Sequence, residues 1–202
     1  AAARAEALRL LERVQLPEAA KRLDAYPHQL SGGQRQRVVI AIALACGPDL
    51  LIADEPTTAL DVTIQREVLD LIQELVREDG MGLLLISHDL GVMADTVQQL
   101  MVMYAGTVVE SGPTAAIFER LAHPYTRGLF AARPRLGLAR GTRLATIAGR
   151  VPELADMPVG CPFADRCDRV LDACRAAKPP VVDIGPGHQA RCLRVEAQAI
   201  PT

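Results

Sequence analysis

Two acidic residues directly after an apolar segment are the first candidates for chemistry in this sequence. Asp54 and Glu55 follow residues 50–53, which read LLIA. Such a segment predicts a strand buried on both faces of a parallel sheet, and ligands bind at the carboxyl ends of such strands. Asp54 is suited to hold Mg²⁺, and Glu55 to act as a general base toward water. The alternative is that the two acids only cap the following turn.

A predicted helix start carries a possible phosphate site. Ser31 and Gln34 have the spacing of a capping box, and Gly32 and Gly33 lie between them. Unpaired N–H groups at a helix start favour a phosphate, and glycine lets the backbone approach the anion closely. The alternative is an ordinary helix cap in a glycine-containing turn.

A histidine follows the second apolar segment. Residues 83–86 read LLLI, and Ser87 and His88 come next. Because parallel strands end at the same edge of a sheet, we expect His88 to lie near Asp54 and Glu55. The other histidines are expected to be structural: His28, His123 and His188.

The elements around these residues follow from the period of the apolar side chains. Helices are predicted over residues 4–16, 31–46, 61–80 and 89–94, and strands over 50–53, 83–86, 97–104 and 107–110. The order strand, helix, strand indicates a parallel α/β sheet flanked by helices, with the last two strands as a hairpin at its edge.

The C-terminal third of the chain has a different composition. Seven prolines lie between residues 134 and 186, and long periodic runs are lacking. We therefore place a domain boundary near residue 132, which gives domains 1–132 and 133–202. A short proline-rich segment buries little core, so the second domain is expected to be irregular and to need a cross-link or a host surface.

Cysteines offer such a cross-link. Four of the five fall in this region: Cys161, Cys167, Cys174 and Cys192. Four thiolates suit an iron–sulfur cluster or tetrahedral zinc, although zinc ribbons usually show closer pairs, and free thiols are the third alternative. The remaining cysteine, Cys46, is expected to be a small core residue.

The overall composition argues against several classes of protein. The 202 residues carry 22 Lys and Arg against 24 Asp and Glu, which argues against a basic nucleic-acid-binding domain. With 50% apolar residues the chain can bury a core, so we expect it to be globular. The apolar run 38–46 is too short to span a bilayer and no signal-like segment begins the chain, so we expect neither a membrane-spanning nor a secreted protein.

Taken in order, these segments resemble the nucleotide-binding domain of ATP-binding cassette (ABC) proteins. Residues 30–34 match the signature motif of that family, 50–55 its Walker B strand, 59–61 its D-loop, and 87–88 its switch histidine. The resemblance covers residues 1–112 as the second half of the cassette. It implies a P-loop-NTPase-like α/β fold with ATP and Mg²⁺ as ligands.

The resemblance also implies a role for each of these residues. In a head-to-tail dimer, residues 31–34 would lie at the γ-phosphate held by the other subunit, with Ser31 and Gly33 touching it. Asp54 would serve Mg²⁺, Glu55 the attacking water and His88 the γ-phosphate. Asp61 would link the two sites across the interface.

One part of the family's pattern is missing from this sequence. A P-loop needs a glycine-rich turn that ends in Lys followed by Ser or Thr. Lys21 is followed by Arg22, and Lys178 by Pro179. We interpret the chain as a product truncated before the Walker A motif, and we expect little ATPase activity from it alone.

The region after the cassette narrows the resemblance. Residues 123–129 (HPYTRGL), 160–163 (GCPF) and 184–188 (IGPGH) are similar to the C-terminal extension of ATPases from oligopeptide, dipeptide and nickel importers. In that family the cysteines of the extension are understood to hold a 4Fe–4S cluster. The resemblance implies the same cluster here, with zinc as the alternative.

The resulting hypothesis is the ATP-hydrolysing subunit of a bacterial peptide or nickel importer, peripheral on the cytoplasmic side of the membrane. Its expected partners are a second ATPase subunit, identical or related, the membrane permease subunits and, indirectly, a substrate-binding protein, with no nucleic acid. Two alternatives stay open. One is a soluble ABC protein that acts on nucleic acid or ribosomes, and the other is a non-catalytic interaction module that carries a cluster or zinc.

Overall fold

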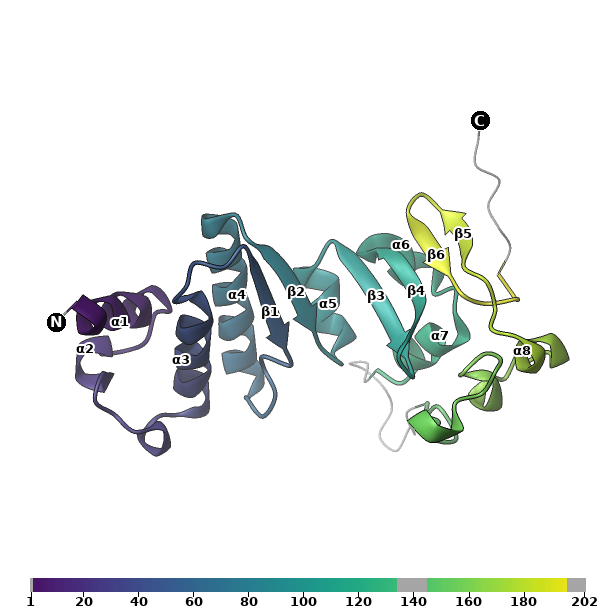
Figure 1. Ribbon diagram of the computed structural model, residues 1–202, viewed down its shortest axis with the longest axis horizontal. Helices are drawn as coiled ribbons and strands as arrows, with labels where there is room; N and C mark the ends of the chain where they lie inside the picture. Colours follow the sequence, from purple (N-terminus) through teal and green to yellow (C-terminus); the bar gives the residue numbers. More distant parts are fainter. Residues whose placement is uncertain (1, 134–144, 196–202) are drawn as a thin grey trace, which may run out of the picture. The chain divides into compact units, whose positions relative to one another are not determined.

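The fold comes from a computed structural model that describes residues 2–133 and 145–195. The chain divides into two compact units, residues 1–92 and 93–202 (Figure 1). The predicted domain boundary near residue 132 lies inside the second unit, beside residues outside the described ranges, and stays a prediction.

The first unit contains most of the predicted α/β elements. They are α1 (Ala2–Arg13), α2 (Ala19–Arg22), the 3-10 turn η1 (Pro27–Gln29), α3 (Gly32–Leu44), β1 (Leu50–Asp54), α4 (Val62–Asp79) and β2 (Gly82–Ile86), followed by α5 (Leu90–Thr96) across the division. Local chemistry fixes the ends of α4. Asp61 accepts a hydrogen bond from the Ile64 N–H at 3.0 Å, and Gly80 ends the helix at φ 64°, a conformation that glycine adopts without steric cost.

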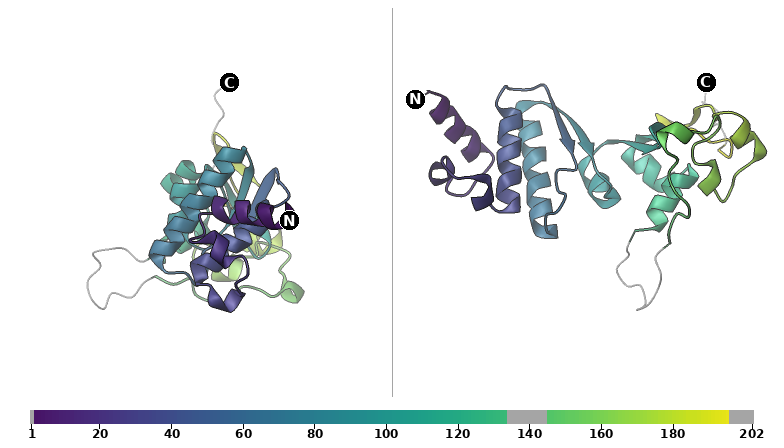
Figure 2. Two further views of the ribbon diagram at one scale, coloured as in Figure 1. Left: turned by 90° about the vertical axis from the view of Figure 1, so that its left-hand side faces the viewer. Right: turned by 60° about the horizontal axis from the view of Figure 1, so that its bottom comes forward.

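The helices of the first unit form its core. α3 packs against α4, and α1 packs against α3 (Figures 1 and 2). Side chains from α3 and α4 are almost completely buried, namely Ile40, Val68, Ile72 and Leu75, as is Val14 just after α1. Cys46 lies beyond the end of α3 and is exposed, so its predicted place in the core is wrong. The helix ends at Leu44, two residues before Cys46, so the helical periodicity that predicted its burial does not extend to it.

The two strands of the first unit pair in parallel, as the order strand, helix, strand predicts. The register runs from Leu50 opposite Gly82 to Asp54 opposite Ile86. One face of the pair is buried through Leu51, Ala53 and Leu85.

The other face of β1 and β2 is uncovered. It carries Leu50, Ile52, Leu84 and Ile86, which are 44 to 59% exposed. The prediction that both faces are buried is therefore wrong for this chain, because within the described ranges no element covers this face.

The second unit is built on an antiparallel sheet in the order β3-β4-β6-β5. Its elements are β3 (Gln99–Tyr104), β4 (Thr107–Pro113), α6 (Thr114–Arg120), α7 (Pro124–Ala131), the 3-10 turns η2 (Leu154–Asp156) and η3 (Ala164–Arg166), α8 (Asp172–Ala176), β5 (Val182–Gly185) and β6 (His188–Ala190). α6 packs against β3 and β4.

This sheet corrects two expectations. The predicted hairpin of β3 and β4 joins β6 rather than the edge of the parallel pair. The C-terminal region is less irregular than predicted, because β4 offers a strand edge on which β6 pairs through Glu110 and Ser111. Gly112 permits this close approach, since a Cβ there would lie 2.9 Å from the Gly187 carbonyl oxygen.

Among the described residues, no helix combines the length and the apolar character that crossing a bilayer requires.

Candidate functional site

Glu55 and His88 meet where the two parallel strands end. The Glu55 N–H donates to the Ile86 carbonyl oxygen at 2.9 Å, which extends the strand pairing by one residue. Beyond it, Glu55 Oε1 lies 2.8 Å from His88 Nδ1. The structure thus brings together the acid and the histidine that the strand pattern predicts at one edge.

A third residue holds the other oxygen of this carboxylate. The Thr58 hydroxyl donates to Glu55 Oε2 at 3.0 Å, and the Thr58 N–H donates to the Glu55 carbonyl oxygen at 3.1 Å. Glu55 itself has φ 49°, a left-handed conformation that is uncommon for glutamate and is found often at functional sites. Thr58 was not predicted from the sequence. The only sequence signal for Thr58 is its position three residues after Glu55, which is the spacing of a tight turn.

Each member of the Glu55–His88 pair shifts the pKa of the other. The hydrogen bond from His88 holds the pKa of Glu55 below its ordinary value, and the bond from Thr58 adds to this shift. The bond to Glu55 and its negative charge raise the pKa of His88. Because the side chains are 36% and 81% exposed, water screens the pair, and it contributes little to stability. In this arrangement Glu55 is a weaker base than a free glutamate.

Asp54 and Asp61 lie on either side of Glu55 in the sequence. Asp54 ends β1 and is exposed, so carboxylate oxygens of the type that a hard cation binds lie at the carboxyl end of this strand, while the predicted Mg²⁺ role stays a prediction. Asp61 caps α4 and is exposed. The structure gives Asp61 a structural task, while its predicted role between two subunits stays a prediction.

Residues 31–34 at the start of α3, called the serine turn below, form the predicted capping box. Ser31 Oγ accepts from the Gln34 N–H at 3.2 Å, and the Gln34 side chain accepts from the Ser31 N–H at 3.0 Å. Ser31 is exposed, so the turn is accessible to a partner. A Cβ at Gly33 would lie only 2.7 Å from Ile64 Cγ2, and one at Gly32 would lie 3.0 Å from a Leu60 methyl group. A side chain at Gly33 would therefore displace Ile64 at the start of α4, whereas one at Gly32 would need only a small shift of the Leu60 side chain.

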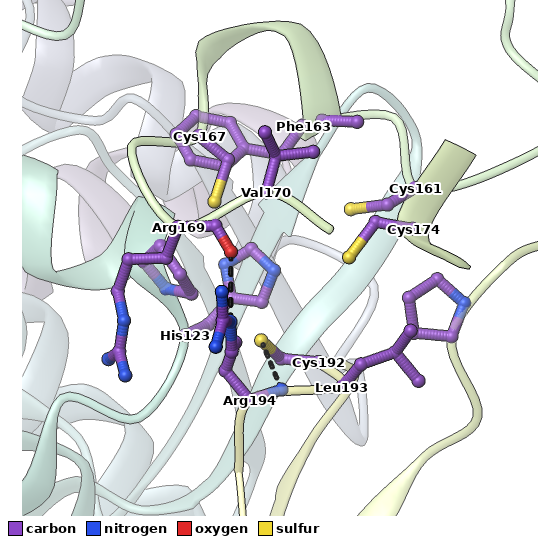
Figure 3. Close-up of a pocket in the computed structure, with 13 residues that line it drawn as sticks. His123, Cys161, Phe163, Cys167, Arg169, Val170, Cys174, Cys192, Leu193 and Arg194 are labelled. Atoms are coloured by element: carbon purple, nitrogen blue, oxygen red, sulfur yellow. Dashed lines mark hydrogen bonds between the residues drawn. The ribbon is translucent and has the colours of Figure 1, made fainter. Parts of the chain in front are cut away.

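The four C-terminal cysteines line one pocket (Figure 3). Cys161 precedes η3, Cys167 follows it, Cys174 lies in α8 and Cys192 follows β6. Residues that are far apart in the sequence thus converge, and all four cysteines are free thiols.

The donor set of this pocket suits a four-thiolate group, but the arrangement does not. Within residues 2–133 and 145–195, no group of three or more His, Cys, Asp or Glu side chains is placed to hold a metal ion. Tetrahedral zinc bonds of about 2.3 Å would bring sulfur atoms within about 3.8 Å of one another. The geometry gives no support to the predicted iron–sulfur cluster or zinc ion.

Burial disfavours the thiolate form of two of these cysteines. It raises the pKa of the Cys161 and Cys167 thiols, and neighbouring cysteines raise both pKa values further. The Cys192 sulfur accepts a hydrogen bond from the Arg194 N–H at 3.4 Å.

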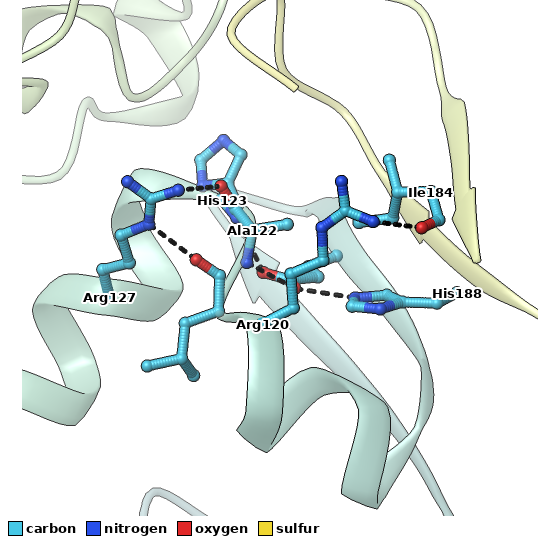
Figure 4. A network of polar contacts seen from close by, with 8 residues as sticks. Arg120, Ala122, His123, Arg127, Ile184 and His188 are labelled. Carbon is cyan, nitrogen blue, oxygen red and sulfur yellow. Dashed lines mark hydrogen bonds and ion pairs between the residues drawn. The ribbon is translucent and has the colours of Figure 1, made fainter. Parts of the chain in front are cut away.

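A second buried polar cluster ties the C-terminal strands to β4 (Figure 4). Glu110 is 1% exposed, and its two carboxylate oxygens accept from the backbone N–H groups of Ala122 and His123, each at 2.9 Å. His188 Nε2 lies 2.9 Å from Glu110 Oε1. His123 and His188 are both buried, as their predicted structural role requires.

Comparison with protein families gives two matches in this chain. The family described as "ABC transporter" matches residues 2–58. The family described as "Oligopeptide/dipeptide transporter, C-terminal region" matches residues 109–174.

Individual relatives agree with both matches. The chain is 54% identical over 193 residues to a Brucella melitensis protein named as a peptide import ATP-binding protein, BMEII0863, covering 93% of this chain and 57% of that protein. It is 49% identical to the dipeptide transport ATP-binding protein DppD of Escherichia coli K12, covering 94% and 58%. It is 50% identical to the oligopeptide transport ATP-binding protein OppD of Mycobacterium tuberculosis, covering 96% and 32%. The chain thus spans about half the length, or less, of these relatives.

Solved structures agree with the fold of the cassette. The ADP conformation of MJ1267, an ATP-binding cassette of an ABC transporter, matches with a TM-score of 0.54 and 25% identity, over 63% of this chain and 49% of that chain. The fold and both family matches define the class that this chain resembles: residues 2–58 match the ABC transporter family, and a solved cassette has a similar fold. Residues 109–174 match the oligopeptide/dipeptide transporter C-terminal region, so within that class the chain is similar to the peptide transport ATP-binding proteins.

Proposed function

We propose that this chain supplies the signature turn and the water-activating edge of an ATP-hydrolysing subunit in a peptide importer. The pairing of Glu55 with His88, one residue beyond Asp54, is the observation that carries the proposal. The names of the relatives favour peptides as the cargo, and nickel is the second candidate from the sequence.

Each of the three residues at the carboxyl ends of β1 and β2 has a role in this proposal. Asp54 holds Mg²⁺, which neutralises phosphate charge when bound. Glu55 accepts a proton from the attacking water. His88 donates a hydrogen bond to the terminal phosphate. Once a phosphate takes over His88, Glu55 loses the partner that lowers its pKa and becomes a stronger base.

The serine turn completes the site from another subunit. Ser31 is exposed and begins a helix whose first N–H groups favour an anion. A head-to-tail dimer would set this turn against the phosphate at the partner's Asp54–Glu55 edge. The membrane permease subunits would then respond to closure of the dimer, with the ATPase peripheral on the cytoplasmic side.

This proposal can be tested by comparing the ATPase activity of the chain, which lacks a P-loop, with that of a chimera that has one. The chain alone is expected to show no ATPase turnover above that of its Glu55→Gln variant. A chimera that adds the part of E. coli DppD which this chain does not match, and which is expected to carry a P-loop, should hydrolyse ATP. In this chimera Glu55→Gln should lower turnover by about 10²-fold or more. Equal turnover of the chimera and of its Glu55→Gln variant would overturn the role of Glu55.

A matched control uses a carboxylate on the same unit that is away from the edge. Glu67 is exposed on α4 and lies 3.5 Å from Arg37. Glu67→Gln should leave the turnover of the chimera within about twofold, because it touches none of the proposed site.

The bound iron–sulfur cluster or zinc stays a prediction from the resemblance. The four cysteines that the prediction names line one pocket, although they are not placed there to hold a metal ion. Brown protein with visible absorbance that bleaches on reduction would favour a cluster, and colourless protein with one zinc would exclude it.

A further inference from the structure

The carboxylate of Glu55 is held at both of its oxygens by residues from different segments. Glu55 Oε1 lies 2.8 Å from His88 Nδ1, and Glu55 Oε2 accepts from the Thr58 hydroxyl at 3.0 Å. His88 follows β2 and is the residue that the proposed function assigns to a phosphate. Thr58 lies in the turn after Glu55, and the proposed function gives it no role. The two contacts can therefore be lost separately.

The turn that carries Thr58 is fixed by its backbone. The Thr58 N–H donates to the Glu55 carbonyl oxygen at 3.1 Å, and the Leu60 N–H donates to the Thr57 carbonyl oxygen at 3.2 Å. The Gln65 side chain on α4 also donates to the Thr57 carbonyl oxygen, at 3.3 Å. Thr57 itself is 8% exposed. Thr58 thus follows a buried, anchored neighbour, and its hydroxyl is preorganised to hold the carboxylate.

Packing does not explain the contact between Thr58 and Glu55. Thr58 is exposed, so no burial requires its hydroxyl to find a partner. Glu55 has φ 49° and Ala59 has φ 62°, conformations that cost energy for residues other than glycine and that collect at functional sites. An exposed hydrogen bond contributes little to stability, so its loss should affect chemistry more than folding.

We propose that Thr58 is a positioning residue whose hydroxyl keeps the Glu55 carboxylate in place once His88 donates to the terminal phosphate. This inference rests on the proposed function of Glu55 as the base toward water. The hydrogen bond from Thr58 occupies Oε2 and leaves Oε1, the oxygen that His88 releases, to accept the proton of the attacking water. Thr58 keeps its own proton throughout.

The need for such a residue follows from the shape of the glutamate side chain. The terminal torsion of glutamate is broad, so a carboxylate without a partner samples many orientations. A general base has to lie within hydrogen-bond distance of the proton that it removes. A misplacement of about 1 Å can lower a rate by about 10²-fold. Loss of the Thr58 hydroxyl should therefore slow the chemical step and leave the binding of ATP unchanged.

The variants Thr58→Val and Thr58→Ser separate the hydroxyl from the shape of the side chain. Both are compared in the chimera with the DppD segment. Thr58→Val should lower kcat about 10-fold or more and change KM for ATP by less than about twofold. Thr58→Ser keeps the hydroxyl and should stay within about threefold of the parent. Thr146→Val is the matched control, because Thr146 is exposed in the second unit and outside the proposed site, and its kcat should stay within about twofold.

A double variant tests whether Thr58 acts through Glu55. In the Glu55→Gln chimera, adding Thr58→Val should not lower kcat further, because the carboxylate that Thr58 positions is already absent. The same fold-loss with and without Glu55 would overturn the inference, since Thr58 would then act independently of the base.

Failure of this inference is distinguishable from failure of the proposed function. If Glu55→Gln leaves turnover unchanged, the proposed function fails. If Glu55→Gln lowers turnover by about 10²-fold while Thr58→Val changes kcat less than twofold, only the role of Thr58 fails. An equal loss of kcat in Thr58→Ser and Thr58→Val would also overturn that role, because the hydroxyl would not be the cause. Circular dichroism of each variant serves to show that the compared proteins are folded.

Discussion

Single histidines in this chain respond to their surroundings in opposite ways. His88 is 81% exposed and paired with Glu55, and its pKa is raised. His123 is 1% exposed, and burial lowers its pKa to about 4. The surroundings decide the direction of each pKa shift. A carboxylate partner at an exposed site favours the charged imidazolium, whereas burial favours the neutral ring.

Removing the partner of His88 should reverse its shift. In Glu55→Gln, the pKa of His88 should fall toward the ordinary value of about 6.5. Two-dimensional NMR of the imidazole protons as a function of pH measures this directly. Thr58→Ala serves as the control, because it removes a bond to the same carboxylate and should leave the pKa of His88 raised. An unchanged His88 titration in Glu55→Gln would show that the 2.8 Å contact is not formed in solution.

His123 should make the second unit less stable in acid. Its folded pKa of about 4 lies below the unfolded value of 6.5, so its contribution is complete above pH 6.5 and is lost as the pH falls toward 4. A shift of this size corresponds to about 3 kcal/mol across that range. The geometry agrees, because His123 Nδ1 accepts from the Tyr125 N–H at 3.1 Å and has to be unprotonated to do so.

Urea unfolding at several pH values measures this effect. His123→Asn keeps a side-chain acceptor at the start of α7 and removes the titration. The variant should therefore lose less stability between about pH 6.5 and pH 4 than the parent chain. Equal slopes for the two proteins would contradict the assignment.

At the scale of elements, one buried carboxylate links separate segments of the second unit. Glu110 lies on β4, receives two N–H groups from the turn between α6 and α7, and contacts His188 on β6. The Glu110 carboxylate thus links β4, the turn between α6 and α7, and β6. A buried charge of this kind is tolerated because each of its oxygens is hydrogen-bonded.

Removing this carboxylate should therefore be costly. Glu110→Ala leaves two backbone donors and His188 unpaired in a buried place, and we expect a loss of about 3 to 5 kcal/mol in the free energy of unfolding. Glu119→Ala is the matched control, because Glu119 is exposed on α6 and its loss should cost less than about 0.5 kcal/mol. Urea unfolding compares the two variants. A similar small loss for both would show that Glu110 does not hold the three elements together.

At the scale of the whole molecule, three observations set this chain apart from a covered parallel sheet with a phosphate-binding loop. The sequence carries no P-loop, the chain spans 57% of its Brucella relative, and one face of the parallel pair is bare. Parallel sheets are normally covered on both faces. The bare face should therefore bind hydrophobic probes and promote association of the chain in solution.

A charge on the bare face should reduce this association without unfolding the protein. Ile52 is 59% exposed, whereas Leu51 beside it is 5% exposed. We expect Ile52→Lys to lower the binding of a hydrophobic dye and the association seen by light scattering, at a cost below about 1 kcal/mol. Leu51→Lys should cost several times more, because it buries a charge. Equal losses of stability would show that both faces are covered in solution.

The sequence by itself determined the local elements and the chemical types at the edge. Ser31 and Asp61 indicate the two helix starts that the structure caps, and the position of Glu55 and His88 after two apolar strands predicts their meeting. These features depend on neighbours in the sequence and on the common edge of parallel strands, so periodicity and capping rules are sufficient.

Only the tertiary structure decided what is covered and what converges. The exposure of Ile52 and Cys46, the hold of Thr58 on Glu55, and the joining of β6 to β4 around Glu110 all depend on which segments meet in space. An apolar strand has the same sequence pattern whether one face or two are covered, and a cysteine has the same letter whether its partner is near or far along the chain. The pairing of Cys161 with the backbone of Cys174 was therefore decided by the fold.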